Sequence, residues 1–156
     1  MSPEAKAEIT KHMGVEPVVI NSSLVSAQNR KRLYWTNIPN LSQPEDKNIK
    51  LQDILEYGYV DRDKSLCIRR RYAGAGGSQS YLCRRYFGKY FDQLVFTSEK
   101  DRDFVKNKWK ENPYFKDTEL PYNIVRALTC LECERLQTLP DNYTACISSE
   151  KERRYR

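Results

Sequence analysis

Histidine is nearly absent from this 156-residue chain, and long apolar runs are absent altogether. Because His12 is the only histidine, a Ser-His-Asp triad could be built only around it, and a two-histidine metal site cannot form. The chain has no run of about 18 apolar residues that a bilayer could hold, and residues 1–14 lack the apolar stretch of a signal peptide. We therefore expect a cytoplasmic protein with no membrane partner and no metal site.

Aliphatic residues are also scarce. Leu, Ile, Val and Phe together make up about a fifth of the chain, which is close to the composition at which disorder sets in. Eleven Tyr and two Trp argue against a wholly disordered chain. The length predicts one domain, or part of one, with a thin core.

Cysteine is present in an odd number, five, so complete pairing within the chain is excluded. In a reducing cytosol we expect free thiols. Cys130 and Cys133 form a C-x-x-C pair, but no second pair follows at zinc-ribbon spacing and the pair lies in a helical pattern. Core or surface thiols are therefore favoured over a metal or redox site.

The local signals predict a mixed chain that starts as an α/β fragment. Ser2 and Pro3 suit the N-cap and first position of a helix that ends at Gly14. Thr129 and Glu132 fit a capping box at the start of a helix that runs to Leu136. Between them the patterns predict, in order, a buried strand over 17–20, a strand over 33–36, a short helix from Leu51 to Gly58, a strand over 91–96 and an exposed helix over 101–110.

The positive charge of the chain is concentrated between Arg62 and Lys89. This stretch contains one acidic residue, Asp63, and accounts for the whole net charge of +6. Its basic residues are Arg62, Lys64, Arg69, Arg70, Arg71, Arg84, Arg85 and Lys89. Glycines and tyrosines lie among them. Arginines can bind phosphates and guanine edges, aromatic rings can stack on bases, and glycines let the backbone follow a groove, so this composition favours nucleic-acid binding. The alternative is a charged, partly disordered insertion.

A second basic motif, Gln28-Asn29-Arg30-Lys31-Arg32, lies between the first two predicted strands. In an extended segment Arg30 and Arg32 share one side, where two guanidinium groups can hold phosphate oxygens or meet a base edge. A solvated basic turn is the alternative.

The segment from Arg126 to Tyr143 has the pattern of a structural helix. Leu128, Leu131 and Leu136 can form an apolar face, and Glu132 with Arg135 is spaced for an ion pair. Nothing in the segment indicates a catalytic acid, base or nucleophile.

Two of these segments resemble motifs of the C5-cytosine-specific DNA methyltransferases. Residues 28–32 resemble the family's Q-x-R-x-R motif. Residues 126–140 are similar to its R-x-L-T-x-x-E-x-x-R-L-Q-x-F-P motif, with Leu139 in place of phenylalanine. The two occur in the family's order, and the basic stretch falls where the family carries its variable target recognition domain.

The resemblance implies the C-terminal part of a Rossmann-like, S-adenosylmethionine-dependent methyltransferase with an inserted, mixed, loop-rich recognition domain. The implied division is a partial catalytic segment over 1–39, a recognition domain over 40–122 and a helical return over 123–156. Such enzymes methylate C5 of a cytosine flipped out of the duplex. Arg32 would then lie beside the flipped cytosine, Arg30 near its backbone, and Gln28 would shape the loop.

The resemblance gives the remaining candidate residues two roles. Together with Gln28, Arg30 and Arg32, the expected DNA-binding residues are Arg69, Arg70, Arg71, Arg84 and Arg85. The expected structural residues of the second motif, which orient the recognition domain, are Arg126, Thr129, Glu132, Arg135 and Gln137.

The family's catalytic parts are missing from the sequence. No cysteine follows a proline, and there is no F-x-G-x-G stretch, no E-N-V and no Gly-Asn after the second motif. We expect a chain that binds double-stranded DNA, belongs to a restriction-modification or other DNA methylation system, and is inactive alone. It would be a truncated product or one subunit of a split enzyme; the alternatives are a non-catalytic DNA-binding module, a functionless remnant and an RNA methyltransferase.

Overall fold

The computed structural model describes residues 1–68, 78–88 and 93–147, and these form a mixed α/β chain with four helices and three two-stranded sheets. The helices are α1 (Pro3–Met13), α2 (Gln79–Phe87), α3 (Glu99–Glu111) and α4 (Cys130–Leu136). The strand pairs are β1 (Val18–Asn21) with β3 (Lys31–Tyr34), β2 (Gln28–Asn29) with β4 (Ser65–Leu66), and β5 (Val95–Phe96) with β6 (Val125–Arg126). The α/β class is confirmed, and a Rossmann-like arrangement stays a prediction.

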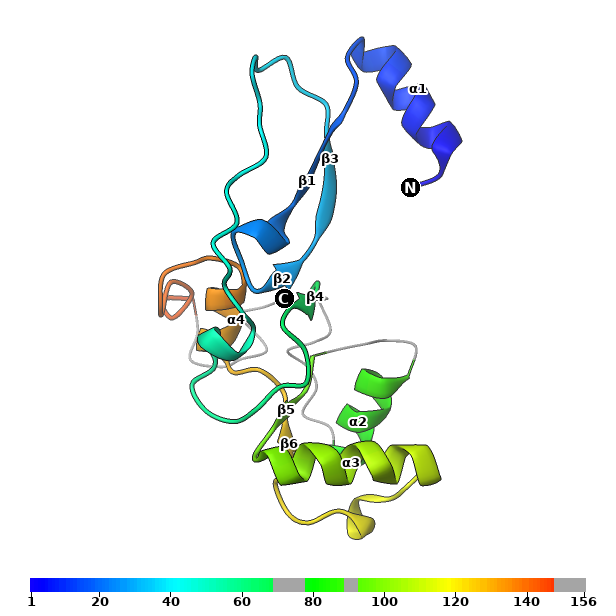
Figure 1. The fold of residues 1–156 in the computed structure, drawn as a ribbon, viewed down its shortest axis with the longest axis vertical. Coiled ribbons are helices and arrows are strands. Elements are labelled where there is room, and N and C mark those ends of the chain that lie inside the picture. The colour runs from blue at the N-terminus through cyan, green and yellow to red at the C-terminus, as the bar shows by residue number, and fades with distance from the viewer. Residues whose placement is uncertain (69–77, 89–92, 148–156) are drawn as a thin grey trace.

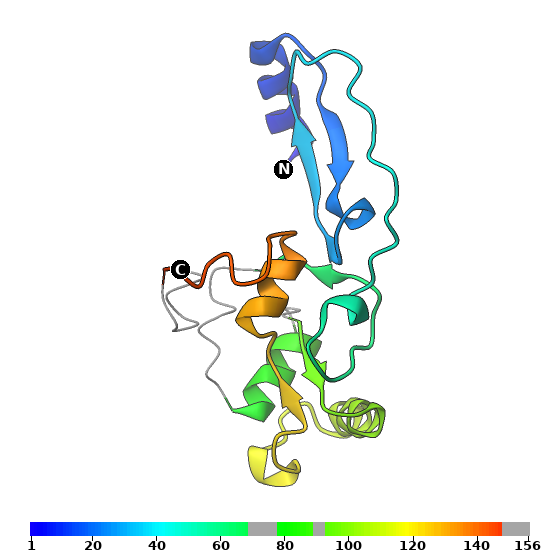
Figure 2. The same ribbon diagram turned by 90° about the vertical axis from the view of Figure 1, so that its left-hand side faces the viewer.

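The molecule is elongated, with α1 and the β1–β3 hairpin at one end and α2 and α3 at the other (Figures 1 and 2). Helix α4 lies between the two ends, close to the short β2–β4 sheet. In the part of the chain that is described, no helix has the length and apolar composition needed to cross a membrane.

Helix α1 begins and ends where the sequence predicts. The Ser2 side chain accepts a hydrogen bond from the Ala5 N–H, and Gly14 ends the helix with a left-handed φ of 68°. No α1 residue is buried. The helix is tied to the hairpin by the Trp35 Nε1–H, which donates to Thr10 Oγ1 at 3.0 Å.

The hairpin is less buried than its sequence predicts. Strands β1 and β3 pair antiparallel from Val18 opposite Tyr34 to Asn21 opposite Lys31. The strand predicted over 17–20 is present as β1, but the expectation that it is buried is wrong, because Val19 is 48% exposed and no β1 residue is buried. In the described ranges, the buried apolar residues form two clusters, and neither includes a residue before Ala27.

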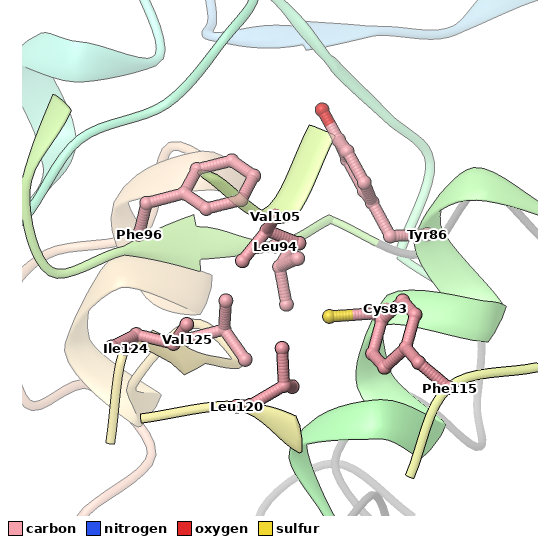
Figure 3. Close-up of a cluster of buried hydrophobic side chains, with 9 residues drawn as sticks. All are labelled: Cys83, Tyr86, Leu94, Phe96, Val105, Phe115, Leu120, Ile124 and Val125. Carbon is pink, nitrogen blue, oxygen red and sulfur yellow. The ribbon is translucent and has the colours of Figure 1, made fainter. Parts of the chain in front are cut away.

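Two apolar clusters form the core, and β5 supplies both. Phe96 points into a cluster built on α2, α3 and β6 (Figure 3). Val95, on the opposite face of the same strand, packs with Leu51, Leu128 and Leu136. Because consecutive strand residues face opposite sides, two residues of β5 join the α2–α3 cluster to the cluster that includes α4.

The first cluster is closed by α2. The Cys83 sulfur points from α2 toward the centre of the cluster, whereas the Tyr86 hydroxyl points away from it (Figure 3). That hydroxyl donates to Asp61 Oδ1, so the buried ring keeps a polar partner. Burial raises the pKa of the Cys83 thiol to about 12, which keeps it protonated at neutral pH.

Several predicted elements differ in extent from those observed; the strand predicted over 33–36, for example, is β3 and spans Lys31–Tyr34. The expected helix from Leu51 to Gly58 is only a 3-10 turn, η2 (Gln52–Ile54), because a left-handed Gly58 (φ 94°) turns the chain so that Tyr59 pairs with Phe96. A Cβ on Gly58 would lie 2.6 Å from the Phe96 carbonyl oxygen, so only glycine fits there. The helix predicted over 101–110 spans Glu99–Glu111 and buries Val105, and the strand predicted over 91–96 is β5, with residues 91 and 92 outside the described ranges.

Candidate nucleic-acid interface

One pocket brings the two sequence motifs together. It holds about 310 Å³ and is lined by Gln28, Arg30 and Arg32 of the first motif and by Gln137 of the second. The first three follow β1 and lie along β2 and β3, whereas Gln137 directly follows α4. Residues more than a hundred positions apart in the sequence therefore share one concave surface.

Gln28 is fixed in this pocket by its backbone and not by its side chain. Ser26 Oγ accepts from the Gln28 N–H at 3.2 Å, and the Ser22 hydroxyl donates to the Gln28 carbonyl at 3.0 Å. Gln28 also lies opposite Ser65 in the parallel β2–β4 pair. The Gln28 side chain is 2% exposed, and its Nε2 has no hydrogen-bond partner among the described residues. A buried amide donor without a partner costs free energy, so binding of a hydrogen-bond acceptor beside this group would be favourable.

Arg30 and Arg32 line the same pocket, which is the same-side placement that an extended segment predicts. Asn21 Oδ1 accepts from the Arg30 backbone N–H at 3.2 Å and fixes the turn into β3. Within the described ranges, neither guanidinium forms an ion pair. No acidic residue lines the pocket, so its charge is positive. Two such groups beside an amide donor make a site suited to anions such as phosphate.

The described arginines of the basic stretch form contacts within the chain instead. Arg62 lies 3.3 Å from Asp61 and stacks over the Tyr86 ring. Arg84 donates to the Phe115 carbonyl, and Arg85 donates to the Tyr81 hydroxyl. None of these arginines lines the pocket. Arg69, Arg70, Arg71 and Lys89 lie outside the described residues.

Lys64 shows most clearly that a basic residue of this stretch can be structural. Its Nζ donates to the carbonyl oxygens of Ser23 at 2.6 Å, Ser26 at 3.0 Å and Ile49 at 2.6 Å. An ammonium group has three donors, so this set uses all of them. Ser26 lines the pocket, and Lys64 therefore links the pocket wall to Ile49.

The second motif contains an ion pair between Arg126 and the buried Glu132. Arg126 contacts both carboxylate oxygens of Glu132 at 2.7 Å, and Glu132 is fully buried. The same carboxylate accepts from the backbone N–H groups of Thr129 and Glu56, and Thr129 caps α4 in the predicted capping box. The Arg126 guanidinium stacks over the Tyr57 ring at 3.9 Å. These contacts give Arg126, Thr129 and Glu132 a packing role.

Arg135 and Glu134 hold the segment that follows α4. Arg135 makes a paired contact with Asp141, at 2.8 and 2.6 Å. Glu134 is buried and accepts from the backbone N–H groups of Asn142 and Thr144. Sequence reasoning missed Glu134, because a glutamate in a short helix reads as a surface residue. It also missed Thr138, which lines the pocket.

The pocket has no cysteine thiol to act as a nucleophile. All five cysteines are thiols that form no disulfide, as predicted, and none of them lines the pocket. Across the described ranges, no group of three or more His, Cys, Asp or Glu side chains could hold a metal ion. Comparison with protein-family models found none that matches this chain.

Proposed function

We propose that this chain is the DNA-holding part of a DNA cytosine-5 methyltransferase, and that the pocket binds the strand that carries the target base. One observation supports this proposal above all: Gln28, Arg30, Arg32 and Gln137 converge on a single pocket. The pocket offers two guanidinium groups and a buried amide donor, and a DNA strand offers phosphate oxygens and base edges that accept such donors.

DNA binding should depend on salt through these arginines. We expect the chain to bind duplex DNA with an affinity that falls steeply as salt rises, and Arg30→Ala with Arg32→Ala to weaken it. The slope of log K against log salt should fall by about 0.9 for each lost phosphate contact. Fluorescence anisotropy with a labelled duplex measures both quantities.

The matched control removes two equal charges from the far end of the molecule. Lys100 and Lys110 lie exposed on α3, away from the pocket. Replacing both with Ala should leave the affinity within about twofold of wild type, since long-range attraction is screened beyond about 10 Å at 0.1 M salt. Equal losses in the two double variants would contradict the proposal, because they would show attraction to net charge alone.

S-adenosylmethionine does not fit the described pocket. Its sulfonium is a cation, whereas the charged groups that line the pocket are those of Arg30 and Arg32. Like charges repel at close range. The pocket is therefore assigned to DNA alone, and the cofactor and the thiolate nucleophile of the reaction would come from another part of the enzyme.

The isolated chain should not methylate DNA. Addition to the base needs a positioned thiolate, and the sequence has no Pro-Cys pair and no cysteine at the pocket. We expect no transfer of a labelled methyl group from S-adenosylmethionine to DNA by the purified chain, measured over hours at micromolar protein. Methyl transfer by the chain alone would refute the proposal that the nucleophile and the cofactor site lie on another part of the enzyme.

A partner chain with the catalytic half is the second part of the proposal. The observation that favours it is that α1 has no buried residue, Val19 on β1 is exposed, and none of the first 26 residues belongs to either apolar cluster. The alternative, a DNA-binding module without chemistry, predicts DNA binding but no activity in any mixture. Co-expression with a fragment that carries Pro-Cys and F-x-G-x-G segments, followed by bisulfite sequencing of host DNA, separates the two.

A further inference from the structure

Thr138 has a backbone conformation that its side chain disfavours. Its φ is +60°, in the left-handed region, where a β-branched residue is a genuine outlier. The other described residues with positive φ are all asparagine or glycine: Gly14, Asn40, Asn48, Gly58, Asn123 and Asn142. Thr138 is therefore the one position in the described ranges where a residue suited to this conformation is missing.

The end of α4 imposes this conformation. The Leu139 N–H donates to the Glu134 carbonyl and the Thr138 N–H to the Arg135 carbonyl, both at 3.0 Å. This is the Schellman arrangement, in which the residue after the C-cap is left-handed and is usually glycine. The helix would end as well, or better, with glycine or asparagine at position 138. Packing gives no reason for threonine either, because Thr138 is exposed.

The position of Thr138 supplies a reason. Thr138 lines the same pocket as Gln28, Arg30 and Arg32. Its hydroxyl proton is donated to the Gln137 carbonyl at 2.6 Å, so the hydroxyl oxygen remains available as an acceptor. The pocket thus places a hydroxyl acceptor beside the donor side chains of Gln28, Arg30 and Arg32. Backbone strain of this kind persists where the side chain has a role in function.

We propose that Thr138 is a ligand-contacting residue whose hydroxyl oxygen accepts a hydrogen bond from an exocyclic amino group of a base held in the pocket. The inference rests on the proposed function, because it takes DNA as the ligand. Exocyclic amino groups are the hydrogen-bond donors that DNA bases present at their edges in the grooves. The arginines hold the strand, and Thr138 distinguishes an amino-bearing base from thymine.

The test uses the full chain and two duplexes that differ in one unpaired base, cytosine or thymine. We expect the wild-type chain to prefer the unpaired cytosine by about fivefold, the value of one neutral hydrogen bond. Thr138→Ser keeps the acceptor and should keep this preference. Thr138→Val keeps the branched shape and should lose it, and Thr138→Gly should lose it while raising the melting temperature by about 2–4 °C.

The control is Asn142→Gly, at a left-handed position that does not line the pocket, and it should leave the preference intact. A Thr138→Val chain that distinguishes the two duplexes as well as wild type would overturn the inference and leave the proposed function standing. A wild-type chain that binds neither duplex would overturn the proposed function, and the inference with it. Wild-type binding of both duplexes with equal affinity would overturn the inference alone.

Discussion

Replacing Arg126 with Met should destabilise the fold by about 3–5 kcal/mol, the loss typical of a buried ion pair broken on one side. Glu132 is fully buried, and Arg126 binds both of its carboxylate oxygens. Methionine fills similar space but leaves a buried carboxylate with only the N–H groups of Thr129 and Glu56 as partners. Urea unfolding followed by circular dichroism measures the change.

Arg135, which lies on α4 as Glu132 does, gives a matched control. It also makes a paired contact with a carboxylate, that of Asp141, but the side chains are 31% and 48% exposed. An exposed pair contributes little, so Arg135→Met should cost about 1 kcal/mol or less. Similar losses in the two variants would contradict the view that burial of Glu132, and not the paired geometry, sets the cost.

The pH dependence of stability should also reflect the interaction between Arg126 and Glu132. Burial by itself would raise the pKa of Glu132, but hydrogen bonds from Arg126 and from the backbone of Thr129 and Glu56 outweigh it and lower the pKa below 4.5. A lowered folded-state pKa contributes stability that is fully present above the unfolded value and is lost as the pH falls through the folded value. The wild-type chain should therefore lose stability on acidification below pH 4.5, and Arg126→Met should lose less.

Local sequence signals predicted both ends of α1 and the start of α4, because each depends on residues within one turn. The caps at Ser2, Gly14 and Thr129 are all formed as expected. Burial was harder to predict, since it depends on what lies opposite. The apolar run at 17–20 has the composition of a buried strand, yet the described chain places no core against it.

Contacts between residues far apart in the sequence could not be predicted from local sequence patterns. Arg126 stacks on Tyr57 and Glu132 binds the Glu56 N–H, although these partners are about seventy residues apart. The two motifs could be recognised by their residue patterns, but nothing in the sequence showed that Gln28 and Gln137 line one pocket. A basic stretch likewise does not reveal which of its charges face outward.

Replacing Lys64 with Met should cost about 2–4 kcal/mol of stability and loosen the pocket wall. The substitution leaves three carbonyl groups, of Ser23, Ser26 and Ile49, without their shared donor. A part-buried polar group that loses a charged partner costs about 1–3 kcal/mol, and water can replace some of these bonds. Hydrogen exchange of residues 22–29 should become faster in the variant. Lys50→Met is the control, since Lys50 is exposed and its ammonium group lies 3.8 Å from the Asp63 carboxylate.

DNA binding by the Lys64→Met chain separates the composition-based prediction from the structural one. If Lys64 contacted phosphate, as its place in the basic stretch predicts, the variant would lose about 0.9 from the salt slope. Its ammonium group is instead fully used by carbonyl oxygens of the chain itself. The affinity should therefore fall while the salt slope stays unchanged, because the pocket wall moves but no phosphate contact is removed. Unchanged hydrogen exchange together with a lower slope would show that Lys64 faces DNA and that the anchoring role is wrong.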